Sequence, residues 1–171
     1  MLRDYVERCE SGVRLAVPAL HHRPARAIEQ ARAACHDVDP SELTLIGSSL
    51  GGFYATVMAE SLGCRAAVIN PAVHPHTHFA RYLGPQKNMY TGEAFELTQA
   101  HVDELRAMDP PAISRPARYW LFVETGDEVL DYREALAYYA GACQTVIQGG
   151  DHTLASFPEH IPELVDWALT Q

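Results

Sequence analysis

Long apolar runs, clustered basic residues and paired cysteines are all scarce in this sequence. No apolar stretch approaches the ~20 residues of a membrane span, and the N-terminal MLRDYVERCE lacks the cationic start and apolar core of a signal peptide. Only 13 Lys and Arg stand against 22 Asp and Glu, a formal net charge of -9. Phosphate binding needs clustered basic side chains, so we expect neither a nucleic-acid nor an anionic-membrane partner.

The cysteines are too few and too far apart for a zinc site or a dense disulfide framework. There are four, with no C-x-x-C pair among them: Cys9, Cys35, Cys64 and Cys143. Such spacing favours free thiols in a reducing compartment, and we expect a cytoplasmic location.

Histidine is plentiful, and three of the nine alternate in the segment HPHTH: His74, His76 and His78. Alternate residues of an extended chain face the same way and could hold a metal. However, Pro75 interrupts the segment and no carboxylate is near in the sequence, which favours a polar loop. We therefore expect no metal at these histidines.

The chain has 171 residues, 47% hydrophobic and 20% charged, which predicts one domain (1–171) with a sizeable core. Apolar periodicity predicts helices at 2–9, 23–36, 50–62, 98–108, 131–140 and 158–169. Strands are expected at 13–20, at the start of 43–54, and at 65–70, 118–125 and 143–148. This alternation predicts an α/β fold, a mostly parallel sheet covered by helices on both faces.

The segment LTLIGSSLGGFY (43–54) is a strand, a tight turn and a helix, and it contains the pattern G-x-S-x-G from Gly47 to Gly51. In a nucleophile elbow of this kind, the serine hydroxyl projects above the sheet from a strained turn. The flanking glycines are expected where a side chain would clash. Ser49 is therefore the candidate nucleophile, although the pattern alone also fits a Ser/Gly turn capping an ordinary helix.

Candidates for a catalytic acid and base follow the last two strands. Asp127 comes after RYWLFVET, and His152 comes after CQTVIQ. The interval between them fits one helix and one strand, which returns the chain to the same end of a parallel sheet. We expect His152 to take the proton of Ser49 while Asp127 orients the imidazole.

Other acidic residues and another histidine compete for these roles. Asp131 is expected to cap the following helix, and Glu124 to remain in the strand. Asp151 fits a loop residue, and His160 a solvent-exposed position in the last helix. Asp127 and His152 remain the favoured pair.

The segment 72–108 is too long for a plain connection and is rich in His, Pro, Gly and Tyr. We expect a lid-like insertion over the site, the alternative being a surface excursion without a role in binding. Its apolar and aromatic residues could contact an acyl chain: Phe79, Tyr82, Leu83, Met89, Tyr90 and Phe95.

Five segments, GSSLGGFYA, VINPAV, YLGPQKNMYTGE, TGDEVLDY and GGDH, together resemble the small bacterial YqiA-like esterases of the α/β-hydrolase superfamily. The resemblance implies a three-layer α/β-hydrolase fold and cleavage of carboxylic esters, with acyl-CoA thioesters as a further substrate class. It implies the triad Ser49, Asp127 and His152, acting on a small-molecule substrate without a cofactor. Ser48 and Leu50 match the positions beside the nucleophile: Ser48 is expected to contact substrate, and the Leu50 N–H would be an oxyanion donor.

The beginning of the chain departs from this family. Relatives begin with a strand ending in a His-Gly-Phe type loop, which supplies the second oxyanion amide ahead of a helix like 2–9. We expect this strand ahead of Met1, and expect its loss in mid-sheet to weaken both stability and turnover, since one oxyanion donor is worth ~3 kcal/mol. Two alternatives stay open: a non-catalytic binding protein of the same fold, and acyl transfer to an alcohol.

Overall fold

The computed structural model describes residues 2–8, 12–88 and 92–170. Its helices are α1 (Leu2–Arg8), α2 (Pro24–Ala34), α3 (Leu50–Leu62), α4 (His76–Phe79), α5 (Gln99–Met108), α6 (Tyr132–Tyr138) and α7 (Phe157–Leu169). Its strands are β1 (Thr44–Ser48), β2 (Arg65–Ile69), β3 (Gly84–Lys87), β4 (Ala94–Leu97), β5 (Tyr119–Glu124) and β6 (Cys143–Ile147). Within these ranges, none of the helices has the length and apolar character to cross a membrane, and Cys35, Cys64 and Cys143 are free thiols.

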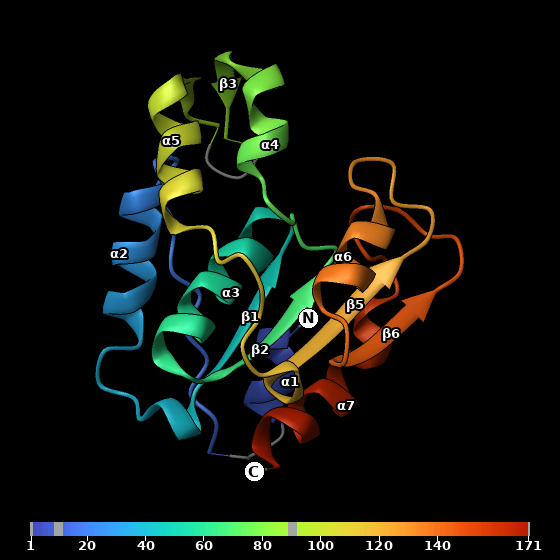
Figure 1. The fold of residues 1–171 in the computed structure, drawn as a ribbon. Helices are drawn as coiled ribbons and strands as arrows, with labels where there is room; N and C mark the ends of the chain where they lie inside the picture. Colours follow the sequence, from blue (N-terminus) through green and yellow to red (C-terminus); the bar gives the residue numbers. More distant parts are fainter. Residues whose placement is uncertain (1, 9–11, 89–91, 171) are drawn as a thin grey trace.

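Four parallel strands form the main sheet in the order β1-β2-β5-β6 (Figure 1). Their carboxyl ends all point towards the end of the sheet where α4 lies. Each parallel pairing needs a crossover, and α3 and α6 supply those from β1 to β2 and from β5 to β6. Every residue of β5 is buried, as expected for an interior strand between two helical layers.

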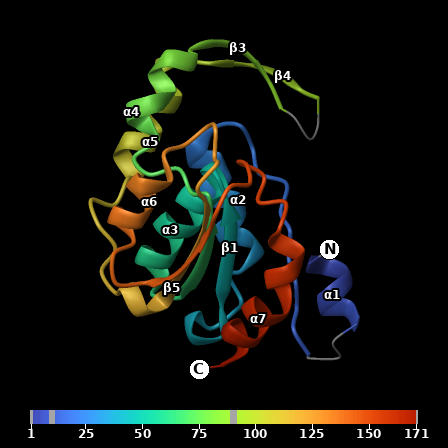
Figure 2. The same ribbon diagram turned by 90° about the vertical axis from the view of Figure 1, so that its right-hand side faces the viewer.

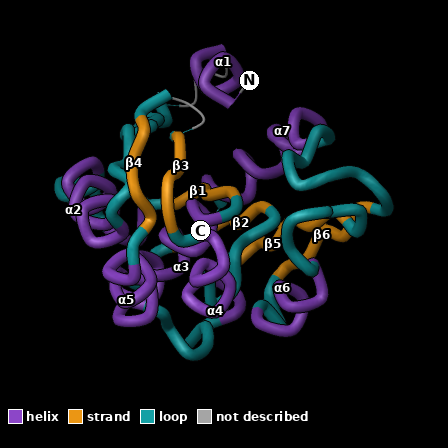
Figure 3. Tube along the Cα trace, turned by 90° about the horizontal axis from the view of Figure 1, so that it is seen from above, coloured by secondary structure: helices purple, strands orange, loops and turns teal. Residues whose placement is uncertain are grey.

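The side chains of β5 alternate between the two faces of the sheet. Tyr119, Leu121 and Val123 pack in the cluster formed with α3 and α6. Trp120 and Phe122 pack in the opposite cluster with Leu164 of α7 and its neighbours. Figure 3 shows α3 and α6 on one side of the sheet and α1 and α7 on the other. The three layers expected from alternating strands and helices are confirmed.

The prediction of a strand at 13–20 is wrong. Residues 12–20 have no regular secondary structure, and Val17 is 66% exposed. A strand requires a neighbour to pair with, but β1 pairs with β2 on one edge and no described strand lies along its other edge. The segment instead packs Val13 and Leu15 among α1 and α7. As a result, β1 is an edge strand of the described sheet. The expectation was a gap in mid-sheet, between a strand at 13–20 and β1.

The segment 72–108 holds more structure than its sequence indicated. The helix expected at 98–108 is α5, but residues 76–79 form α4, so the expectation of a polar loop is wrong there. A short 3-10 helix (Ala80–Tyr82) leads into the antiparallel hairpin β3–β4. Figure 2 shows this hairpin extending beyond α4 and α5, away from the sheet.

Two stacked imidazoles join the loop before α2, the hairpin and α5. The Thr98 N–H donates to Nδ1 of His101 (3.1 Å), so that nitrogen carries no proton. The His101 Nε2–H then donates to Nδ1 of His22 (3.1 Å), whose ring stacks on Phe95 with centroids 4.6 Å apart. Both imidazoles must be neutral for this chain of hydrogen bonds to exist.

Desolvation lowers the pKa of both His22 and His101, and the Arg23 guanidinium acts in the same direction. Glu93 opposes the shift at His22, and Glu104 opposes it at His101. Since the folded pKa of each group lies below its unfolded value, the unfolded chain binds more protons in acid. The stability from this junction is therefore present above about pH 6.5 and is lost as the pH falls below it.

We expect His101→Asn to reduce this acid sensitivity, because the Asn Oδ1 can accept the Thr98 N–H without titrating. The drop in melting temperature between about pH 7.5 and about pH 5.5 should be smaller than in wild type, at ~2 to 4 °C per kcal/mol of linked protonation. Thermal melts of both proteins, with the exposed His36→Asn as control, measure this. An identical drop in wild type and His101→Asn would contradict the assignment.

Candidate active site

The turn between β1 and α3 holds Ser49 in a strained conformation, with φ 54° and ψ -122°. Its N–H donates to the Ile69 carbonyl (2.9 Å) at the end of β2. Its carbonyl accepts the N–H groups of Gly52 (3.0 Å) and Ala72 (3.0 Å). A non-glycine residue persists in this backbone region only when its surroundings hold it there, and these bonds fix Ser49 to β2 and α3 together.

Two glycines allow the close packing of this turn. A Cβ at Gly47 would lie 2.1 Å from the Gly51 carbonyl oxygen, and one at Gly52 would lie 2.8 Å from Cβ of Pro71. A Cβ at Gly51 would meet nothing within 4 Å. The expected clash on both sides of Ser49 is therefore right for Gly47 and wrong for Gly51, and Gly52 is the second glycine that sterics require.

The structure brings the three predicted catalytic side chains into one hydrogen-bonded chain. His152 Nε2 lies 3.0 Å from Ser49 Oγ, and His152 Nδ1 lies 2.8 Å from Asp127 Oδ2. A carboxyl oxygen beside Nδ1 favours the tautomer with the proton on that nitrogen. The Nε2 lone pair is then free to accept the hydrogen of the Ser49 hydroxyl.

Asp127 is more deeply buried than His152. The side chain of Asp127 is 1% exposed, compared with 19% for His152. Oδ1 of Asp127 accepts the N–H groups of Val129 (2.8 Å) and Leu130 (2.9 Å). Those two bonds leave Oδ2 directed at the imidazole, so the carboxyl group has one orientation.

The competing residues have other contacts. The Asp131 side chain caps α6, as expected. Asp151 accepts both the N–H and the hydroxyl of Thr153, and that hydroxyl lowers the pKa of Asp151. His160 was expected to be exposed but is half-buried, with its ring 5.5 Å from that of Phe122.

Only some of the residues expected to contact substrate lie beside the hydrogen-bonded side chains of Ser49, His152 and Asp127. Ser48 is exposed at the end of β1, and Leu50 is the first residue of α3. Tyr82 is 48% exposed, and within the described ranges no hydrogen bond or ring contact joins it to Ser49, His152 or Asp127. Met89 and Tyr90 lie outside the described residues.

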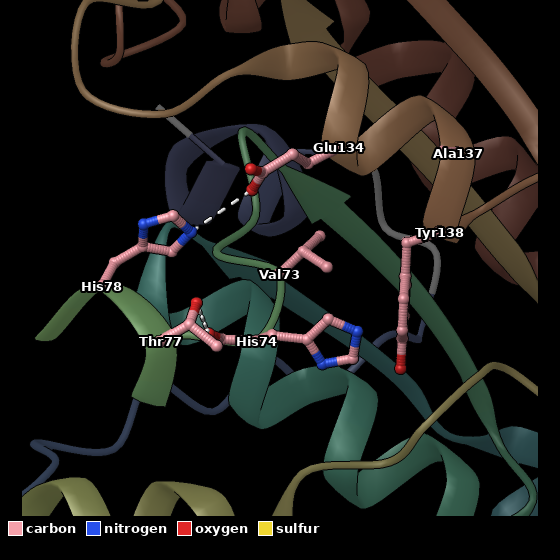
Figure 4. Close-up of a pocket in the computed structure, with 7 residues that line it drawn as sticks. All are labelled: Val73, His74, Thr77, His78, Glu134, Ala137 and Tyr138. Atoms are coloured by element: carbon pink, nitrogen blue, oxygen red, sulfur yellow. Dashed lines mark hydrogen bonds and ion pairs between the residues drawn. The ribbon is translucent and has the colours of Figure 1, made fainter.

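A cavity of about 470 Å³ lies between α4 and α6 (Figure 4) and is lined by Val73, His74, Thr77, His78, Glu134, Ala137 and Tyr138. Val73 follows Ala72, whose N–H donates to the Ser49 carbonyl (3.0 Å), so one wall of the cavity continues from the turn that carries Ser49. Nε2 of His78 and Oε2 of Glu134 face each other at 3.5 Å. The α6 wall was missed because nothing local in its sequence distinguishes it from a surface helix.

The alternating histidines contact carboxyl groups that are distant in the sequence. Nδ1 of His74 and Nδ1 of His76 lie 2.8 and 2.9 Å from Oδ2 of Asp109, and His78 faces Glu134. No carboxylate is close to these histidines in the sequence, but Asp109 and Glu134 are close to them in the structure. The expectation that no carboxylate is nearby is therefore wrong. Among the described residues, no group of three or more His, Cys, Asp or Glu is arranged to hold a metal ion.

Several solved structures share this architecture. A putative hydrolase from Agrobacterium vitis superposes with a TM-score of 0.63 at 16% identity, covering 86% of this chain and 69% of its own. Mouse alpha/beta hydrolase domain-containing protein 10 gives 0.62 at 18% identity, covering 84% and 68%. The esterase domain of a Rhodothermus marinus protein gives 0.59 at 22% identity, covering 82% and 68%.

At these identities the similarity shows the fold alone, which is that of the α/β hydrolases. The family is shown by the sequence itself, because a family model matches residues 1–169, nearly the whole chain. The resemblance to YqiA-like proteins is thereby confirmed, and the chain belongs to the family described as "Uncharacterised protein family (UPF0227)".

Proposed function

We propose that this protein is a serine hydrolase that cleaves carboxylic esters through an acyl-enzyme. The observation that carries the proposal is the hydrogen-bonded chain from Asp127 through His152 to Ser49. A hydroxyl is a weak nucleophile unless an adjacent base removes its proton. Here the imidazole of His152 lies within hydrogen-bond reach of the Ser49 hydroxyl and is itself oriented by the Asp127 carboxyl group.

In the proposed reaction, Ser49 Oγ attacks the ester carbonyl carbon while His152 Nε2 accepts the hydroxyl proton. Asp127 stabilises the imidazolium that forms. The imidazolium then donates its proton to the leaving alcohol as the carbon–oxygen bond breaks, which leaves the acyl group on Ser49. Water then attacks the acyl-enzyme while His152 Nε2 accepts its proton. The imidazolium returns that proton to Ser49 Oγ as the acyl bond breaks, and the carboxylic acid leaves. An acyl-CoA thioester would follow the same course with a thiol as leaving group.

The N-terminus of α3 supports the negative charge that develops on the carbonyl oxygen. The first N–H groups of a helix have no partner within the helix, and Leu50 is the first residue of α3. Its N–H and the positive end of the helix dipole both stabilise an oxyanion beside Ser49. One such donor typically contributes ~3 kcal/mol to the transition state.

The cavity between α4 and α6 is the proposed binding site for part of the substrate. Its volume of about 470 Å³ falls within the roughly 300 to 1,000 Å³ of small-molecule pockets. Val73, Ala137 and Tyr138 supply apolar surface for an acyl chain.

Replacing Ser49 tests the nucleophile. Ser49→Ala should lower turnover of p-nitrophenyl butyrate on the order of 10³-fold or more, and should abolish labelling by a fluorophosphonate probe. Ser61→Ala, on the last turn of α3, is the matched control and should keep both activities. Retained hydrolysis by a folded Ser49→Ala protein would refute the assignment, and an unlabelled wild type would favour the non-catalytic binding protein.

The two aspartates after β5 can be separated by one pair of variants. Asp127→Asn should lower kcat roughly 10⁴-fold, since an amide cannot hold the required imidazole tautomer. Asp131→Asn should change kcat little, because asparagine also caps helices well. Steady-state hydrolysis of the same ester by both proteins decides the matter, and the opposite ranking would move the acid to Asp131.

Filling the cavity tests the acyl site. Ala137→Phe should lower kcat/KM for a hexanoate ester about 10-fold more than for an acetate ester, as expected if even two methylenes lose ~0.8 kcal/mol each. Ala140→Phe, just beyond α6 and outside the cavity lining, is the control for added surface bulk. Equal losses for both esters would show that the acyl chain binds elsewhere.

A further inference from the structure

A buried carboxyl group holds the loop that carries His152. Glu124 is the last residue of β5 and is 2% exposed. Its Oε2 accepts the Asp151 N–H at 2.7 Å, and its Oε1 accepts the Ser156 hydroxyl at 2.9 Å. The two donors lie on either side of His152 in the chain, so one side chain holds both ends of the loop.

The loop backbone is packed directly against this carboxyl group. A Cβ at Gly150 would lie 2.1 Å from both Cδ and Oε2 of Glu124, and Gly150 has φ +71°. Only glycine satisfies both the close approach and the left-handed backbone without strain. The loop is therefore shaped around the Glu124 side chain.

A second buried side chain completes the frame. Nδ2 of Asn70 donates to the carbonyl oxygens of Asp151 (3.2 Å) and His152 (3.1 Å), and its Oδ1 accepts the Glu124 N–H (3.0 Å). Asn70 follows Ile69, whose carbonyl accepts the Ser49 N–H. The loop bearing the base is thus tied to the residues that hold the nucleophile.

We propose that Glu124 is a positioning residue, which fixes the 150–156 loop so that His152 faces both Ser49 and Asp127. This inference rests on the proposed serine hydrolase function. Burying a carboxyl group is costly even when it is hydrogen-bonded, and well-packed apolar side chains often stabilise such sites as well or better. Both side-chain hydrogen bonds of Glu124 go to the 150–156 loop, which carries His152. Their contribution is therefore to the position of that loop.

Two variants of Glu124 and one matched control test the proposal. Glu124→Ala removes both acceptors, whereas Glu124→Gln can restore the contacts by accepting the Asp151 N–H and donating to the Ser156 hydroxyl oxygen. Glu60→Ala is the control, because Glu60 likewise accepts one backbone N–H, from Ser114 (3.0 Å), and one hydroxyl, from Tyr119 (2.6 Å). Its partners lie outside the 150–156 loop.

Rates should be expressed per active site, titrated with the fluorophosphonate probe. Glu124→Ala should lower kcat about 100-fold with little change in KM, the size of effect that a ~1 Å misplacement of a catalytic group produces. Glu124→Gln should recover most of kcat, and Glu60→Ala should keep wild-type kcat per site whatever its melting temperature.

The downfield ¹H NMR signal of the His152 Nδ1–H, which lies 2.8 Å from Asp127 Oδ2, can be followed in the same proteins without turnover. This signal should be lost or shifted upfield in Glu124→Ala and return towards its wild-type position in Glu124→Gln. If wild type hydrolyses no ester, the proposed function fails, while this signal still decides the positioning role. An unchanged His152 signal in Glu124→Ala, or an unchanged kcat per titrated site in an active enzyme, would overturn the proposal and leave Glu124 a purely structural residue.

Discussion

The backbone of Ser49 is the constraint on which the rest of the site depends. A residue with positive φ must join β1 to α3 while its N–H and carbonyl bond both β2 and the segment after β2. Gly47 and Gly52 provide the room for this approach. Because the turn is bonded in several directions, the serine hydroxyl has little freedom to move away from the sheet end where Asp127 and His152 lie.

Much of this arrangement could be predicted from local patterns. The β5 sequence alternates large side chains between two faces, which predicts a strand covered on both sides. Gly63 ends α3 with φ 79°, as a glycine after a helix predicts. Asp127 and His152 follow neighbouring parallel strands, and the carboxyl ends of such strands meet at one edge. Their proximity to Ser49 therefore follows from topology without knowledge of side-chain contacts.

The features that sequence reasoning missed depend on contacts between distant segments. The segment 13–20 has the composition of a strand, but strand formation requires a pairing partner that the sheet order does not offer it. The pairing of His74 with Asp109, and of Glu124 with the loop of His152, joins residues more than 25 positions apart. No local periodicity encodes such pairs, because they depend on how the α5 and β6 connections return to the sheet.

The separation between Ser49 and His152 has a consequence for the synthesis of the protein. The two residues are 103 positions apart, so the hydroxyl and the imidazole cannot meet until β6 has been made and has docked beside β5. At the usual ~5 to 20 residues per second of translation, about 5 to 20 s pass between the incorporation of the two residues. Throughout that interval the nascent chain carries a serine without its base. The proposed chemistry is thus withheld until the last strand of the sheet has folded.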